Sequence, residues 1–340
     1  MKHVFIINSH TTFMTAMGVI NLNKISYSDI ILIYTRNYKN SLLSFNSKIV
    51  DFTAECEYCN QNIFKTRKTR NECISLVDKC IEYNIRESFE LYFPHLQLII
   101  CQLFYTHSFC VNGSYIQEGG YPQSKKFIST FSLKDRIINF IANKIIRPNK
   151  RVVRSIGWYQ PNYLLKQDVI NSYALNDTFF LYLNSVNHII KWPQYDIDFP
   201  IEQNSIIFIF DGFVNNGIVE YDFYMEACSM IINKYACDVN YLKFHPAQKV
   251  DERMQIRNMY KDYQKVEDLS DDIPFEAIIS SCGKLNIVGF SSSLLKFASD
   301  CGHNVIVNDN LLIESPMYRN HIHTSGFPYM WELVKQNGCL

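Results

Sequence analysis

Residues 205–212 read SIIFIFDG, a short run of aliphatic and aromatic residues that ends at Asp211-Gly212. An apolar run of this length, bounded by turn residues, is typical of a strand buried on both faces of a parallel sheet. A helical pattern over 220–235 and a second strand-like run at Val239–Phe244 follow it. Strand, helix and strand in this order indicate a βαβ unit and therefore a parallel α/β sheet.

The same alternation extends in both directions along the chain. Further strands are predicted within Ile278–Gly289 and at Asn304–Val307, Val4–Ile7, Asp29–Tyr34, Phe89–Phe93 and Val111–Ile116, with helices at 67–85, near 96–106 and from Ser292. A chain of 340 residues is long enough for two such cores. We therefore expect an α/β protein with two Rossmann-like domains that face a central cleft, an N-terminal one over 1–165 and a C-terminal one over 166–340.

The composition excludes several classes of protein. Hydrophobic residues make up 47% of the chain and charged residues 19%, which indicates a packed globular protein. The formal net charge is zero, which argues against a nucleic-acid partner. The chain begins with Met1-Lys2-His3 and a strand-like VFII instead of a signal peptide, and no apolar run is long enough to span a bilayer. The prediction is a cytoplasmic protein.

The cysteines give no sign of a metal centre. There are 11 of them, and the one closely spaced pair, Cys56 and Cys59, has no second CxxC to complete a tetrahedral zinc site. We therefore expect reduced thiols and no metal.

A basic segment lies between the two predicted cores. The expected helix Leu133–Ile146 and the residues that follow it carry Lys134, Arg136, Lys144, Arg147, Lys150, Arg151 and Arg154. One interpretation is peripheral contact with an anionic membrane surface. The other, which we favour because charge runs are usually solvated, is a helix face leading into an interdomain linker.

The first chemical motif is Gln117-Glu118-Gly119-Gly120, directly after a predicted strand. Open α/β sheets build their sites at the carboxyl ends of strands. A carboxylate held on a tight turn there can act as a general base on a substrate hydroxyl. Glu-Gly turns are also common as ordinary turns, so this motif does not decide the function by itself.

The second motif is Lys243-Phe244-His245-Pro246, at the end of another strand. The proline biases His245 towards an extended backbone, so that its imidazole projects from the strand end. A histidine there can donate to a phosphate oxygen or protonate a leaving group. The alternative is a histidine with only a structural role in the core.

Two further motifs follow. Gly289-Phe290-Ser291-Ser292-Ser293 joins a strand to a helix, where hydroxyls and free amides favour an anion, although one serine is enough to cap the helix. Ile273-Pro274-Phe275-Glu276 places a carboxylate in the first turn of a helix. Glu276 either complements the helix dipole or accepts hydrogen bonds from a ribose.

Taken in order, these motifs resemble those of the bacterial sialyltransferases that share D/E-D/E-G, HP and SS motifs. That group includes lipooligosaccharide sialyltransferases, capsular polysialyltransferases and marine-type multifunctional sialyltransferases. Gln117 departs from the pattern, since it replaces the first acid. The resemblance implies a GT-B fold and an inverting, metal-independent transfer of sialic acid from CMP-sialic acid to a galactoside, with no cofactor.

The resemblance also implies roles for individual residues. Glu118 matches the general base and His245 the group that stabilises or protonates the departing phosphate. The SS pair matches Ser291 and Ser292, with Ser293 an equal alternative. Further donor-side residues are Glu276, Pro246 and Lys243, and acceptor-side residues are His10, Thr11 and Gly119. Asp211, which also ends a strand, is a rival base; we favour Glu118 because a base facing the acceptor belongs on the first domain.

Several alternatives stay open at this level. A transferase that uses CMP-Kdo or another CMP-nonulosonic acid would need the same phosphate and ribose contacts. A catalytically inactive CMP-binding scaffold of polysaccharide assembly would tolerate the glutamine at position 117. The acceptors that the resemblance implies are lipopolysaccharide, O-antigen or capsule precursors, lipid-linked at the inner membrane. The linkage, α2,3 or α2,6, and the oligomeric state are left open.

Overall fold

The computed structural model describes residues 1–39, 47–119, 137, 141, 151–152, 169–181, 183–196, 201–246, 248–270 and 273–325. Most of the basic segment lies outside these residues. The chain divides into two compact units, Met1–Glu118 with Pro122–Pro193, and Gly119–Tyr121 with Gln194–Leu340.

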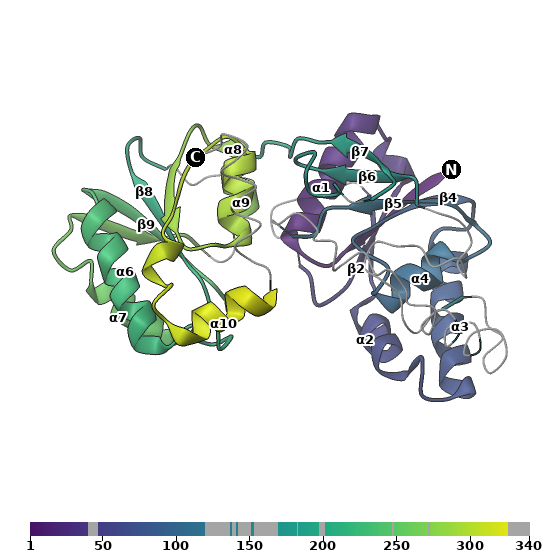
Figure 1. Ribbon diagram of the computed structural model, residues 1–340. Helices are drawn as coiled ribbons and strands as arrows, with labels where there is room; N and C mark the ends of the chain where they lie inside the picture. Colours follow the sequence, from purple (N-terminus) through teal and green to yellow (C-terminus); the bar gives the residue numbers. More distant parts are fainter. Residues whose placement is uncertain are drawn as a thin grey trace. The chain divides into compact units, whose positions relative to one another are not determined.

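The first unit is built on a seven-stranded parallel sheet in the order β3-β2-β1-β4-β5-β6-β7. Its elements in the described residues are β1 (Lys2–Ile7), α1 (His10–Asn23), the 3₁₀ helix η1 (Tyr27–Asp29), β2 (Ile30–Tyr34), β3 (Lys48–Asp51), α2 (Thr53–Asn62), α3 (Arg67–Asn84), β4 (Phe89–Phe93), α4 (Ile99–Tyr105), β5 (Cys110–Ile116), β6 (Asn171–Ala174) and β7 (Val186–Ile189). Helices α2, α3 and α4 pack together on one face of this sheet, and α1 covers the other (Figure 1).

The second unit has a five-stranded parallel sheet in the order β10-β9-β8-β11-β12. Its elements in the described residues are β8 (Ile206–Phe210), α6 (Tyr221–Tyr235), β9 (Val239–Phe244), α7 (Val250–Asn258), β10 (Lys265–Asp268), α8 (Phe275–Ser281), β11 (Asn286–Gly289), α9 (Ser293–Asp300), β12 (Asn304–Val307), the 3₁₀ helix η3 (Asp309–Leu311) and α10 (Pro316–Ser325). Side chains from β8, β9 and β11 form its core with α6 and α7 (Figure 1).

The predicted class, an α/β protein with two Rossmann-like units as in the GT-B type, is confirmed by these two parallel sheets. The boundary predicted at 165/166 comes too early, since the first unit extends to Pro193. The reason is that β6 and β7 add to the edge of the first sheet beside β5.

In both sheets the strand order reverses about the first strand, between β1 and β4 in the first unit and between β8 and β11 in the second. Open parallel sheets bind ligands outside the carboxyl ends of the strands at this position. In each unit a site is therefore expected at the carboxyl ends of the strands, and the motifs can be compared with these two positions.

Among the described residues, no helix is both long enough and apolar enough to cross a bilayer. Of the basic segment, Arg151 is described. Its guanidinium lies 2.9 Å from the Asp78 carboxylate and donates to the Leu103 carbonyl oxygen, so this member of the run is tied to the fold of the first unit.

Candidate functional site

Four polar side chains meet at the carboxyl edge of the first sheet, and we call them the Glu118 cluster. Asn8 follows β1, Arg36 follows β2, His95 follows β4 and Glu118 follows β5. These strands are neighbours in the order β2-β1-β4-β5, so their carboxyl ends bring together residues that are up to 110 positions apart.

Both oxygens of the Glu118 carboxylate are engaged in the cluster. The Asn8 side-chain amide donates to Oε1 at 2.7 Å, and the Arg36 guanidinium donates to the same oxygen at 3.3 Å. His95 Nε2 lies 3.1 Å from Oε2. The exposed fractions of the side chains are 17% for Glu118, 5% for His95 and 52% for Arg36. The carboxylate is thus contacted by three side chains and remains partly open to solvent.

These contacts change the acidity of Glu118. Burial by itself raises the pKa of Glu118, but the hydrogen bond and charge of His95, followed by Arg36 and Asn8, outweigh it. The pKa of the carboxyl group is therefore lower than usual. At neutral pH Glu118 is an ionised carboxylate that can accept a proton.

The local backbone holds the partners of Glu118 in place. Asn8 is fixed through Thr12, whose hydroxyl accepts from the Asn8 backbone amide at 3.1 Å and donates to its side-chain oxygen at 3.2 Å. Arg36 and Asn37 both have a φ of 55°, in the left-handed region that non-glycine residues rarely adopt. Such backbone strain is often found at functional sites, and here it presents Arg36 to Glu118.

The other residues of the first motif and of the Asn8 loop have separate positions. The Gln117 side-chain oxygen accepts from the Leu175 backbone amide at 2.8 Å, so the residue that replaces the first acid links β5 to the end of β6. His10 is the first residue of α1 and meets the Tyr38 ring edge-on at 5.1 Å. Thr11 is buried in the first turn of α1, and Gly119 directly follows Glu118.

In the second unit, His245 follows β9 and is exposed. Its backbone amide donates to the Phe210 carbonyl oxygen at 2.9 Å and to the Gln248 side-chain oxygen at 3.0 Å. Gln248 is in turn held by Glu252, to which it donates at 2.7 Å. Partial desolvation, followed by the positive charge of Arg253, lowers the pKa of His245. The HP turn is therefore fixed, and its imidazole favours the neutral form.

The serine triplet follows β11. Gly289 ends this strand, and a Cβ atom there would lie 2.7 Å from the Ile209 carbonyl oxygen, so the close approach of β11 to β8 requires glycine. Ser292 is the N-cap of α9 and its hydroxyl accepts from the Leu295 amide at 3.3 Å. Ser293 is the first residue of the helix.

Ser291 has a partner that the sequence did not suggest. Its backbone amide donates to Asp309 Oδ1 at 2.6 Å, and its hydroxyl donates to Asp309 Oδ2. In this structure a carboxylate from the end of β12 therefore occupies the two donors that we expected to bind phosphate.

Asp211, the rival base, lies at the end of β8 and is 9% exposed. Its Oδ2 atom is buried, with no hydrogen-bond partner among the described residues. Burial, followed by the negative charge of Asp309, raises the pKa of Asp211 well above its usual range. Asp211 therefore favours the protonated form and is less accessible than Glu118.

Two predicted donor-side residues are buried. Lys243 donates through Nζ to the Ser270 carbonyl oxygen at 3.2 Å, and so ties β9 to the segment after β10. We predicted it as a donor ligand, but in this structure it has a structural partner. Glu276 lies in the first turn of α8, 8% exposed. Pro246 is exposed beside His245.

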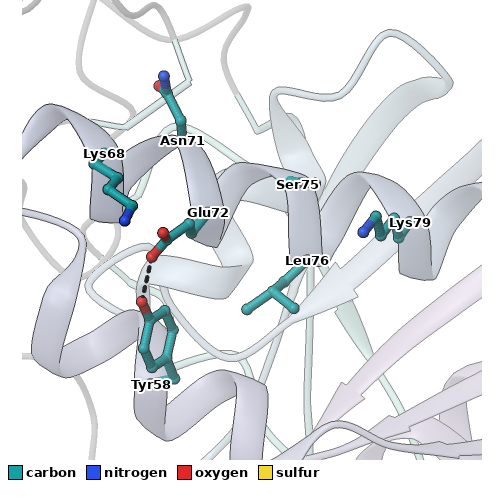
Figure 2. A pocket seen from close by; sticks show the side chains of 7 residues that line it. All are labelled: Tyr58, Lys68, Asn71, Glu72, Ser75, Leu76 and Lys79. Carbon is teal, nitrogen blue, oxygen red and sulfur yellow. Dashed lines mark hydrogen bonds between the residues drawn. The ribbon is translucent and has the colours of Figure 1, made fainter.

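A pocket of about 590 Å³ lies away from both sets of motifs, between α2 and α3 (Figure 2). Its lining residues are Tyr58, Lys68, Asn71, Glu72, Ser75, Leu76 and Lys79. The Tyr58 hydroxyl donates to Glu72 at 2.6 Å, which raises the pKa of Tyr58 to about 12. None of the residues singled out by the sequence motifs lines this pocket.

No group of three or more His, Cys, Asp or Glu side chains placed to hold a metal ion occurs in the described part of the chain. The two cysteines of the CxxC pair both lie buried on α2. Their thiols belong to the core of the first unit, where burial raises the pKa of each.

Sequence reasoning missed His95, Arg36 and Asp309. A signal for His95 existed, since Pro94-His95 directly follows the strand Phe89–Phe93. The position of Arg36 depends on a left-handed backbone conformation, which its local sequence does not predict. Asp309 lies 18 positions from Ser291 and meets it because β12 pairs with β11.

Comparisons with known proteins are weak. No family model matches the sequence, and no curated protein matches it. Solved structures do match the fold, and three of them are described here. A complex of S. aureus MnaA with UDP is 11% identical to this chain and has a TM-score of 0.49. The alignment covers 95% of this chain and 82% of MnaA. A sialyltransferase from Photobacterium damsela is 13% identical, with a TM-score of 0.47 and coverages of 94% and 78%. The spinosyn rhamnosyltransferase SpnG is 10% identical, with a TM-score of 0.48 and coverages of 96% and 85%. Similarity at this level establishes no activity, substrate or residue role for this chain.

Proposed function

We propose that this protein is an inverting glycosyltransferase that moves sialic acid from CMP-sialic acid to a hydroxyl of a galactoside in a bacterial surface glycan. The observation that carries the proposal is the position of the motifs. The carboxylate-Gly, HP and serine motifs each follow a strand at the carboxyl edge of a parallel sheet, after β5, β9 and β11. Parallel α/β sheets bind nucleotides and their substrates at that edge.

In the proposed reaction, Glu118 is the general base. The acceptor oxygen forms a bond to the anomeric carbon while the bond from that carbon to the CMP phosphate oxygen breaks. The acceptor hydroxyl becomes strongly acidic only as its oxygen is consumed in the new bond. A carboxylate with a low pKa can therefore still take the proton at that stage. Glu118 suits this role better than Asp211, because it is ionised and partly exposed.

His245 and the serine triplet would receive the leaving group. The electron pair of the breaking bond stays on the phosphate, which gains negative charge. Preorganised donors that meet such charge supply much of the rate enhancement in many enzymes. His245 is held on a fixed turn and is open to solvent, so that it can donate to a phosphate oxygen once it carries a proton. A phosphate at Ser291 would have to replace the Asp309 carboxylate, which accepts from both donors of this residue.

The donor half of the proposal has a direct test by calorimetry. We expect the purified protein to bind CMP, and Glu276→Gln to weaken that binding about tenfold, since a charge-assisted hydrogen bond to a ribose would be lost. Glu314→Gln, a change at a side chain that is 79% exposed on the same unit, is the matched control and should leave the affinity unchanged. Absence of CMP binding by the unmodified protein would contradict the proposal.

A further inference from the structure

His95 makes the closest contact with Oε2 of the candidate base. Its Nε2 lies 3.1 Å from Glu118 Oε2, and the side chain is 5% exposed, so little water competes with this contact. Asn8 holds the other oxygen, Oε1, at 2.7 Å. The two contacts engage different oxygens of the carboxylate and come from residues that follow the neighbouring strands β4 and β1.

The other described groups near Glu118 either make a longer contact or carry no charge. Arg36, after β2, is half exposed and its contact is longer, at 3.3 Å. Cys101 on α4 interacts electrostatically with Glu118. Burial raises the pKa of this thiol well above its usual range, so the thiol stays neutral. Among the described residues facing Glu118, His95 therefore combines a close contact with burial, and its positive charge when protonated lowers the pKa of Glu118.

We propose that His95 is a positioning residue for Glu118: from the end of β4 it holds Oε2 of the carboxylate and fixes the orientation of the base. This inference rests on the proposed role of Glu118 as the base. In physical terms the buried imidazole offsets the desolvation of the carboxylate. Without it, desolvation is the largest remaining influence on Glu118.

The pH dependence of kcat/KM should report the pKa of Glu118 if this residue is the base. In the unmodified protein the pKa of Glu118 is below its usual value, so the base stays ionised down to that pH and the acidic limb of kcat/KM lies at low pH. In His95→Gln the partner charge is gone and burial raises the pKa of Glu118. The acidic limb should move to higher pH by about one unit or more. At pH values well below both pKa values, each unit of this shift should lower kcat/KM of the variant about tenfold relative to the unmodified protein.

The control is a second His–Glu pair in the same unit. His3 on β1 lies 3.5 Å from Glu90 on β4. His3→Gln removes a histidine beside a carboxylate without touching the Glu118 cluster, and should leave the pH profile unchanged. If His95→Gln does not fold, His95→Asn provides the same test, with folding checked by circular dichroism.

A readout that does not need activity separates this inference from the proposed function. The ¹³C signal of the Glu118 carboxyl, assigned by its loss in Glu118→Gln, should titrate at higher pH in His95→Gln than in the unmodified protein. An unchanged midpoint and an unchanged pH profile would overturn the role of His95. A shifted midpoint together with an active Glu118→Gln would keep the contact but reject Glu118 as the base.

Discussion

Glu118→Gln is expected to lower kcat by about 10²- to 10⁴-fold, the usual contribution of general-base catalysis. Glutamine has nearly the same shape and can keep the contact with Asn8, but it cannot take a proton from the acceptor hydroxyl. Since the change lies in the first unit, binding of CMP should stay unchanged by calorimetry. The measurement is steady-state transfer at saturating donor, with kcat and KM determined separately for the acceptor.

Two comparison variants make this result decisive. Glu90→Gln removes another partly buried carboxylate of the same unit, which pairs with His3, and should keep near-normal turnover. Asp211→Asn changes the rival base. If Asp211→Asn abolishes turnover while Glu118→Gln retains it, the base lies in the second unit and our assignment is wrong.

His245→Gln is expected to lower kcat by about 10²- to 10³-fold, because a donor aimed at the developing charge on the phosphate would be lost. The lowered pKa of His245 means that the imidazole is largely neutral in the free protein at pH 7. Negative charge on a bound phosphate would raise its pKa and bring a proton to the site. We therefore expect the loss in kcat, with the acceptor KM little changed.

The matched control for His245 is His321→Gln, which alters a histidine on α10 of the same unit. This variant should keep its turnover. Equal losses in His245→Gln and His321→Gln would indicate a general effect on the second unit. A His245→Gln variant with unchanged kcat would remove the HP histidine from the mechanism.

Much of the fold could be predicted because buried parallel strands have a strong sequence pattern. The strands β9 and β12 have the predicted bounds, and β8 and β5 differ by one residue. The strand β6 could not be predicted in the same way, because its sequence, NSYA, has no apolar run. It belongs to the first sheet because it pairs with β5. The first unit therefore extends to Pro193, beyond the predicted boundary.

The site could be predicted only where a motif is local. Glu118, His245 and the serine triplet are recognisable because each stands directly after a strand. Their partners are set by the order of strands in the sheet, which no short motif encodes. Asn8 and His95 reach Glu118 because β1 and β4 lie beside one another and β4 beside β5, and Asp309 reaches Ser291 because β12 pairs with β11.

The proposed transfer itself is the most direct test of this account. The purified protein would be incubated with CMP-sialic acid and a small panel of β-galactosides, with CMP-Kdo as the competing donor, and the product would be examined by NMR. We predict release of CMP together with an α-linked sialoside, since the donor is β-linked and the transfer inverts. Transfer from CMP-Kdo alone would reject sialic acid as the sugar. Binding of CMP without transfer from either donor would contradict the enzymatic function and favour a nucleotide-binding scaffold.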